Sequence, residues 1–165
     1  VLKLLFIFLI FFYHANANDK SELIIHDIPK PIVLNEIYDN KDEIIIPFTK
    51  GKKFTIINFW ATWCAPCIKE IPDLLKIQNT QKKKFDVIFV SVGLNPAKDV
   101  KKFVKKNKFK NMKIFYDKNL KFSKGLGVNT IPTTIVLDKK GMEIIKASGY
   151  IDWNSKEKKL LLKNL

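Results

Sequence analysis

Cys64 and Cys67, the only cysteines in the chain, limit most strongly what it can fold into and do. Ala65 and Pro66 separate them, an apolar run over 54–60 precedes them, and a segment with helical periodicity follows. The apolar run predicts a buried strand, and a strand that leads into C-x-x-C at a helix start is typical of a redox site. Unpaired N–H groups at a helix N-terminus stabilise negative charge, which favours Cys64 as a thiolate near neutral pH.

Two other uses of a cysteine pair fit this spacing poorly. A disulfide across two intervening residues closes almost no loop, so it would constrain the unfolded chain very little as a structural staple. A structural zinc site needs four ligands, but there is no second cysteine pair, and His14 and His26 are the only histidines. We therefore expect Cys64 and Cys67 to form a redox-active disulfide, with no metal and no cofactor.

The first 17 residues have the three parts of a secretory signal peptide. Lys3 supplies a positive charge, Leu4–Phe12 is an unbroken apolar run, and Ala15-Asn16-Ala17 has the small-x-small form of a cleavage site. We expect cleavage after Ala17, a folded domain over 18–165, and a periplasmic or other extracytoplasmic location. An uncleaved membrane anchor is the alternative, although the apolar run is shorter than the roughly 20 residues of a spanning helix.

The formal net charge of +14 comes from lysine alone, because the 30 basic residues include no arginine. These lysines are scattered along the chain, and arginine is the usual bidentate reader of guanine. We therefore expect a solvated basic surface and no nucleic-acid partner. With 165 residues, of which 47% are hydrophobic and 28% charged, the chain is long enough for one domain with a core.

Alternating strand and helix patterns predict one domain with a mixed sheet covered by helices. Before the strand over 54–60 we expect a short edge hairpin, made by Ile32–Leu34 and Ile44–Ile46 around a turn at 39–42. The run over 86–92 is too apolar to be half exposed, which predicts a central parallel strand. The other predicted elements are helices over 64–82, 96–107, 120–126 and 153–165, a strand over 113–116, and an antiparallel hairpin of strands over 133–138 and 143–147.

Together with the downstream segment Thr130-Ile131-Pro132-Thr133, this arrangement resembles the thioredoxin fold. The resemblance covers about residues 20–165 and rests on two motifs at the right separation. It implies that the peptide bond before Pro132 is cis and that Pro132 faces the cysteine pair. The predicted fold class is therefore α/β, a thioredoxin fold with an N-terminal β-hairpin and an inserted helix-strand element.

Within that superfamily the chain resembles the exported thiol-disulfide oxidoreductases of the TlpA/ResA group, with cytochrome c maturation thioredoxins as near relatives. Asn58 stands where cytosolic thioredoxins carry a buried aspartate, and Lys69-Glu70-Ile71-Pro72 follows the second cysteine as in that group. The insertion over about 96–116 and the signal peptide are shared as well. Ala65 departs from members that carry an acidic residue there, which leaves the reduction potential open.

A mechanism follows as a hypothesis. Cys64 attacks a substrate disulfide, and Cys67 then resolves the mixed disulfide. Asn58 cannot take a proton, so another group must help to activate Cys67. Glu70 is the candidate, because it follows Cys67 by three residues and therefore lies on the same side of the helix. A solvated helix carboxylate with no catalytic role is the alternative for Glu70.

The expected substrate-binding residues are Trp63, Ala65, Pro66, Ile131 and Pro132. Trp63 is expected to cover the exposed sulfur, whereas Trp60 fits the core. Pro132 has no N–H that could compete for the thiolate. An extended substrate peptide would pair with the backbone of Ile131 by strand addition.

The resemblance implies a thiol-disulfide oxidoreductase that reduces disulfides in proteins such as apocytochrome c and is itself re-reduced by a membrane thiol donor. We expect a monomer. A non-catalytic binding or copper-delivery module is the alternative, since copper(I) accepts two thiolates, but no His or Met stands near Cys64. A peroxidase of related fold would need an arginine that the chain lacks.

Overall fold

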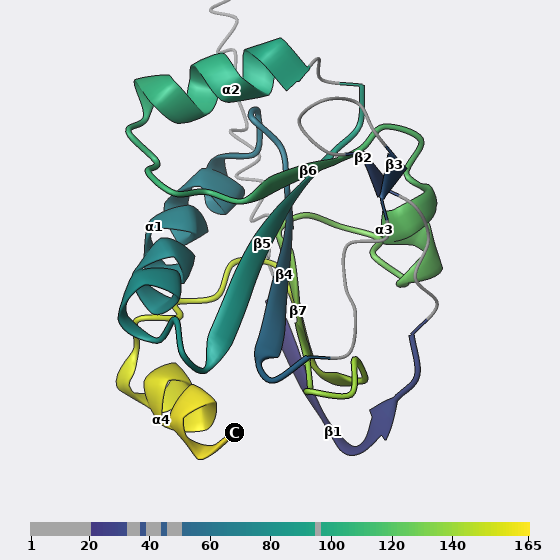
Figure 1. Ribbon diagram of the computed structural model, residues 1–165, viewed down its shortest axis with the longest axis vertical. Helices are drawn as coiled ribbons and strands as arrows, with labels where there is room; N and C mark the ends of the chain where they lie inside the picture. The colour runs from purple at the N-terminus through teal and green to yellow at the C-terminus, as the bar shows by residue number, and fades with distance from the viewer. Residues whose placement is uncertain (1–20, 33–36, 39–43, 46–50, 95–96) are drawn as a thin grey trace, which may run out of the picture.

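The computed structural model describes residues 21–32, 37–38, 44–45, 51–94 and 97–165. These residues form one mixed sheet of eight strands flanked by four helices (Figure 1). The strands are β1 (Glu22–Lys30), β2 (Ile37–Tyr38), β3 (Ile44–Ile45), β4 (Phe54–Trp60), β5 (Phe85–Val92), β6 (Ile114–Asp117), β7 (Thr133–Leu137) and β8 (Glu143–Ser148). The helices are α1 (Ala65–Thr80), α2 (Ala97–Lys106), α3 (Lys121–Gly125) and α4 (Lys156–Asn164).

Strand β4 lies in the interior of the sheet and leads directly to the cysteines. It is parallel to β5 and antiparallel to β7, and the strand order across the sheet is β1-β8-β7-β4-β5-β6-β2-β3. β5 is also parallel to β6, while β7 and β8 form the predicted antiparallel hairpin. The predicted mixed α/β architecture is confirmed, including the inserted helix and strand, which are α2 and β6.

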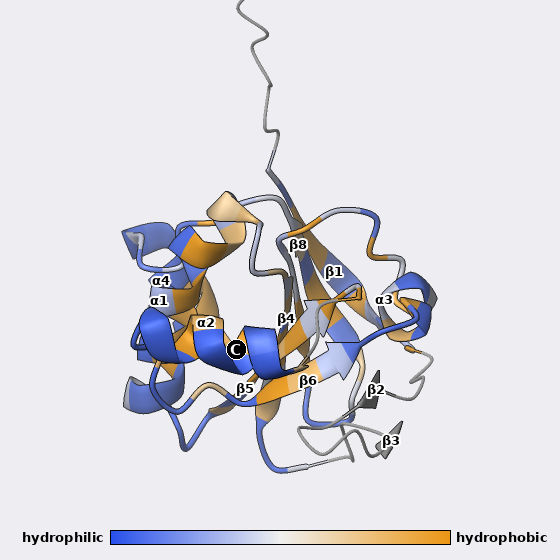
Figure 2. Cartoon of the chain, turned by 90° about the horizontal axis from the view of Figure 1, so that it is seen from above, coloured by the Kyte–Doolittle hydropathy of each residue, from blue (hydrophilic) through white to orange (hydrophobic). Residues whose placement is uncertain are grey.

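Successive side chains of β4 point to opposite faces of the sheet and divide the core into two clusters. Ile56 and Trp60 pack on the face covered by α1, α2 and α4, which we call the α1 face. Ile57 and Phe59 pack on the opposite face, covered by α3, which we call the α3 face (Figure 2). Asn58 shares its parity with the first pair, so the strand directs a buried amide toward α1.

The N-terminal strands differ from the sequence prediction. Strand β1 is not predicted, because most of its side chains are exposed and it contains Pro29, yet it pairs with β8 at the edge of the sheet, where proline is tolerated. The predicted hairpin lies at the opposite edge, but its first strand is β2. The prediction of a strand at Ile32–Leu34 is wrong at Ile32, and 33–34 lie outside the described residues.

From β4 to the C-terminus, predicted and observed ends of the elements differ by three residues or fewer. The largest difference is at the last helix, where Trp153 lies in the turn before α4. The predicted signal peptide over 1–17 and the turn at 39–42 lie outside the described residues. Among the helices that the described segments contain, none combines the length and apolar character that crossing a bilayer requires.

Candidate active site

Cys64 and Cys67 form a disulfide at the N-terminus of α1. Cys64 is the N-cap of the helix, and the backbone N–H of Cys67 donates a hydrogen bond to the Cys64 Sγ at 3.3 Å. Ala65 is exposed, and Pro66 occupies the first turn, where its missing N–H leaves no helical bond unmade. Cys67 is fully buried while Cys64 is 5% exposed, so Cys64 is the sulfur that a substrate can reach.

The peptide bond between Ile131 and Pro132 is cis, as the resemblance implied. In the pairing of β4 with β7, Thr133 stands opposite Phe59. Pro132 therefore lies at the end of the sheet where β4 passes into the C-x-x-C segment. Antiparallel pairing over a distance of more than 70 residues in sequence thus brings the two predicted motifs to one end of the molecule.

Hydrogen bonds fix the Pro132 loop from two sides. The backbone N–H of Gly149 donates to the Pro132 carbonyl at 2.8 Å, and the Thr133 hydroxyl donates to the Thr130 carbonyl at 2.8 Å. Gly149 has a φ of +80°, and a Cβ at this position would lie 3.0 Å from the Cα of Ser21. Glycine therefore allows the end of β8 to pass close to the start of β1 while its N–H reaches the loop.

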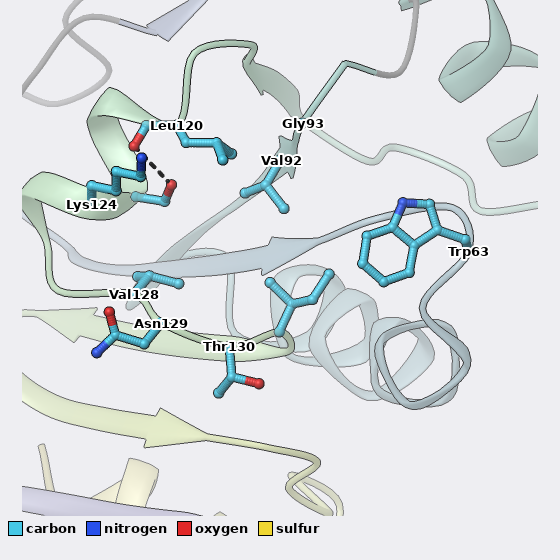
Figure 3. Close-up of a pocket in the computed structure, with 10 residues that line it drawn as sticks. Trp63, Val92, Gly93, Leu120, Lys124, Val128, Asn129 and Thr130 are labelled. Carbon is cyan, nitrogen blue, oxygen red and sulfur yellow. Dashed lines mark hydrogen bonds between the residues drawn. The ribbon is translucent and has the colours of Figure 1, made fainter.

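An apolar pocket of about 410 Å³ opens beside Trp63, the residue before Cys64. Figure 3 shows the Trp63 ring on one side of the pocket and Leu120 and Lys124 on the other. Its other lining residues are Val92, Gly93, Ser123, Val128, Asn129, Thr130 and Ile131. Of the predicted substrate-binding residues, Trp63 and Ile131 line the pocket, whereas Ala65, Pro66 and Pro132 do not.

The two tryptophans of the C-x-x-C segment lie in different environments. Trp60 is fully buried on the α1 face, as predicted. The Trp63 side chain is 71% exposed, which is unusual for so large an apolar group. Its free surface faces the pocket and is available to a partner.

Polar contacts at both ends hold α3, the far wall of the pocket. The buried Asp117 carboxylate accepts the backbone N–H groups of Phe122 at 3.2 Å and Ser123 at 2.7 Å. At the other end the Lys146 ammonium donates to the carbonyls of Leu126 at 2.8 Å and Gly127 at 2.7 Å. The pocket is therefore built between two fixed elements.

Glu70 is fully buried in the second turn of α1, so the alternative of a solvated helix carboxylate is wrong. Thr134 donates to its Oε1 at 3.3 Å, and the indole N–H of Trp153 donates to the same oxygen. Asn58 donates to the Glu70 Oε2 at 3.4 Å and to the Thr134 hydroxyl at 3.0 Å. Three elements distant in sequence thus converge on one carboxylate, one helical turn beyond Cys67.

The chain matches the family described as Redoxin over residues 43–160. This match covers more than two thirds of the sequence. The protein belongs to the Redoxin family.

Its relatives agree on the chemistry. The thiol-disulfide oxidoreductase ResA of Bacillus cereus is 30% identical over 137 residues, which cover 83% of this redoxin and 77% of that protein. ResA of Geobacillus thermodenitrificans is 28% identical over 143 residues, covering 86% and 79%. The crystal structure of a DsbF homologue from Corynebacterium diphtheriae has the same fold, with a TM-score of 0.70, 21% identity, and coverage of 92% of this chain and 96% of that chain. The redoxin is thus a ResA-type, thioredoxin-like thiol-disulfide oxidoreductase that acts on disulfides.

Burial raises the pKa of Glu70 in this redoxin from 4.5 to about 7, because desolvation disfavours the ionised carboxylate. Hydrogen bonds from Trp153, Thr134 and Asn58 oppose the rise, since each donor stabilises the ionised form. The charge of Asp73, one turn further along α1, adds to it. A carboxyl with a pKa near neutrality can both take and return a proton under ordinary conditions.

Sequence reasoning proposed Cys64, Cys67 and Glu70 as site residues but did not anticipate that Thr134 and Trp153 bind the Glu70 carboxylate. The position of Thr134, two residues after the cis-proline, could have been found, because β-strand periodicity places it on the same face as Asn58 once the strands are paired. Trp153 carries no comparable local signal, since 83 positions separate it from Glu70.

Proposed function

We propose that this redoxin is an exported reductase of protein disulfides. In this proposal Cys64 is the nucleophile, Cys67 the resolving thiol and Glu70 the group that takes the proton from Cys67. The observation that carries the proposal is a buried carboxylate one helical turn beyond the fully buried Cys67, whose partner Cys64 keeps a small exposed fraction of 5%.

The proposed reaction has two steps that balance in electrons and protons. The Cys64 thiolate attacks one sulfur of the substrate disulfide, and the other substrate sulfur leaves as a thiolate. Cys67 then gives its thiol proton to the Glu70 carboxylate and attacks the Cys64 sulfur. The Cys64–Cys67 disulfide closes, the second substrate sulfur leaves as a thiolate, and the substrate has gained two electrons.

Two features of the site favour reduction of the substrate over its oxidation. Strong oxidants of this chemistry stabilise their own reduced form. Here, among the described residues, the Cys64 Sγ accepts one hydrogen bond, from the backbone of Cys67, and an ionised Glu70 would oppose a thiolate beside it. A dithiol that is poorly stabilised gives up its electrons more readily.

The nucleophile assignment is tested by reduction of insulin with a thiol donor present. Cys64→Ser should abolish the activity, whereas Cys67→Ser should accumulate mixed disulfides that appear as higher bands on non-reducing gels. Full activity of the Cys64→Ser variant would contradict the assignment.

The direction is tested by a redox titration of the Cys64–Cys67 pair. A two-electron potential more negative than about −220 mV would support a reductase, and a value near about −120 mV would indicate an oxidant. Copper bound to the purified protein, with no defined two-electron couple, would instead favour the binding module considered from the sequence.

The substrate we propose is an extended, cysteine-bearing segment such as that of apocytochrome c. Its backbone would pair with Ile131 beside Pro132, and an apolar side chain would enter the pocket next to Trp63. Ala65 and Pro66, at the mouth of the helix, would contact the same segment. Trapping with Cys67→Ser and a peptide containing one C-x-x-C disulfide tests this, with a peptide of scrambled flanking residues as the control.

Export and recycling complete the proposal. The segment over 1–17 would direct the chain out of the cytoplasm, and a membrane thiol donor would re-reduce the disulfide. Cell fractionation with N-terminal sequencing tests this: an extracytoplasmic protein that begins at Asn18 supports cleavage, one that keeps residues 1–17 at the membrane supports an anchor, and a cytoplasmic protein contradicts export.

A further inference from the structure

The two oxygens of the Glu70 carboxylate have unequal surroundings. Oε1 accepts hydrogen bonds from both the Thr134 hydroxyl and the Trp153 indole N–H. Among the described residues, Oε2 accepts one hydrogen bond, from the Asn58 amide at 3.4 Å. Donors stabilise the oxygen they bind in its ionised form, so this arrangement leaves Oε2 as the oxygen that takes a proton.

Burial alone does not explain the contact with Trp153. Trp60 is equally buried in the same cluster, yet its indole N–H has no hydrogen-bond partner among the described residues. Trp153 lies in the turn before α4, and its N–H reaches across the core to α1. One tryptophan of this core therefore only fills space, whereas the other also fixes the orientation of a carboxylate.

We propose that Trp153 and Thr134 are positioning residues for the redox reaction, which hold Glu70 through Oε1 so that Oε2 exchanges the proton of Cys67. This inference rests on the proposed role of Glu70. It assigns a function to the C-terminal segment and to β7, which the C-x-x-C and cis-proline motifs do not cover.

The proposal predicts how Glu70 titrates when its donors are removed. A donor that binds the carboxylate stabilises its ionised form, so loss of the donor should raise the pKa of Glu70. The charged group that acts on Glu70 directly is Asp73, on the same helix, and Asp152 beside Trp153 acts on Asp73. Neither is removed in the variants below, and β4 and β7 contribute the neutral Asn58 and Thr134.

The experiment compares Trp153→Phe with Trp60→Phe in the oxidised protein, where the cysteines do not titrate. Both variants replace a buried indole by a smaller ring, but only one removes a donor to Glu70. The carboxyl carbon of Glu70 is followed by ¹³C NMR against pH, with its signal assigned by its absence in Glu70→Gln. Trp153→Phe should raise the pKa of Glu70 by about one pH unit and Trp60→Phe should leave it unchanged. Equal values in the two variants would overturn the proposal.

A second pair of variants keeps the test open if Trp153→Phe does not fold. Thr134→Val removes the hydroxyl with little change in volume and should raise the pKa of Glu70, whereas Thr134→Ser keeps a donor and should restore it. No difference between the two would contradict the role of Thr134.

The reduced protein provides the functional measurement. In a single turnover, the pH midpoint for resolving the mixed disulfide should move upward in Trp153→Phe by the same amount as the pKa of Glu70. A slower reaction with an unchanged midpoint would show a merely structural role for Trp153. If Glu70→Gln resolves the mixed disulfide as fast as the native protein, the proposed role of Glu70 fails, while the titration of the oxidised protein still decides whether the donors hold the carboxylate.

Discussion

The two faces of the sheet are built from the same strands but differ in what they bury. The α3 face is an apolar cluster of aliphatic and aromatic side chains, such as Ile57, Phe59 and Phe122. The α1 face contains an apolar cluster as well, but Asn58, Glu70 and Thr134 lie buried within it. Alternate residues of β4 point to opposite faces, so a single step along the strand leads from the polar Asn58 on the α1 face to an apolar core residue on the α3 face.

The difference shows where this fold buries a group that lowers its stability but that the proposed reaction needs. A buried carboxyl is expensive unless donors surround it, and here three donors offset part of the desolvation. The α3 face also buries a carboxylate, that of Asp117, but two backbone N–H groups of α3 bind it directly. The outer edge of this face forms the pocket beside Trp63. We therefore expect substitutions on the α3 face to change stability or substrate affinity, and substitutions on the α1 face to change proton chemistry.

The largest expected effect is on stability, from Phe122→Ala on the α3 face. Phe122 is fully buried and its ring centroid lies 5.8 Å from that of Phe59, so truncation should lower the free energy of unfolding by about 3–5 kcal/mol. Denaturant unfolding of the oxidised protein measures this. Leu160→Ala serves as the control, because Leu160 is 55% exposed and its truncation should have little effect. If Phe122→Ala also altered the pH dependence of activity, the expectation that the α3 face does not affect proton chemistry would be contradicted.

The second prediction concerns the stability of the α1 face against pH. Glu70 titrates near 4.5 in the unfolded chain and near 7 in the folded one, so the folded state keeps its proton to higher pH. The stability that this group contributes is complete below about pH 4.5 and is lost as the pH rises through about 7, in total about 3 kcal/mol. Unfolding of the native protein and Glu70→Gln from pH 4 to 8 measures it. Parallel curves for the two proteins would contradict the raised pKa.

The same contrast explains which parts of the fold were predictable. From β4 onward the central strands have continuous apolar runs and α1 and α2 have apolar stripes, because both faces of those strands and the inner faces of those helices are buried. Strand β1 lacks such a signal, since it is an edge strand with exposed side chains such as Ile28, and only its pairing with β8 makes it a strand. Likewise, β2 at Ile37–Tyr38 depends on pairing with β6 and not on local composition.

The residues of the candidate site also differ in how far the sequence could predict them. Cys64 and Cys67 belong to a short motif that its spacing makes recognisable, whereas Pro132 was predicted from the resemblance to the thioredoxin fold. Helical spacing also predicted that Glu70 lies on the same side of the helix as Cys67, but it could not distinguish a buried carboxylate from a solvated one. That distinction depends on what covers α1, and the cover includes Trp153 from the far end of the chain.

The third prediction is a loss of activity on the α1 face. Glu70→Gln keeps the shape of the side chain but cannot take a proton, so resolution of the mixed disulfide at pH 7 should slow by about 100-fold. Rapid quenching of a single turnover, with separation of the mixed disulfide, measures this step. Asp73→Asn on the same helix is the control for charge, since Asp73 is a second carboxyl of α1 that acts on Glu70 through its charge, so its loss should slow the step far less. An equal loss in both variants would indicate a general effect of charge on α1.

The smallest expected effect belongs to the pocket at the edge of the α3 face. Trp63→Ala removes the exposed ring that lines it, and the kcat/KM for a protein disulfide should fall about tenfold, since burying a large apolar side chain contributes about 1.5 kcal/mol or more. The reaction with a small disulfide such as hydroxyethyl disulfide should be unaffected, because it is too small to fill the pocket. The loss should appear in KM, with the pH profile unchanged. A change in the pH profile would mean that Trp63 acts on the cysteines, and the assignment of binding to one face and proton transfer to the other would then fail.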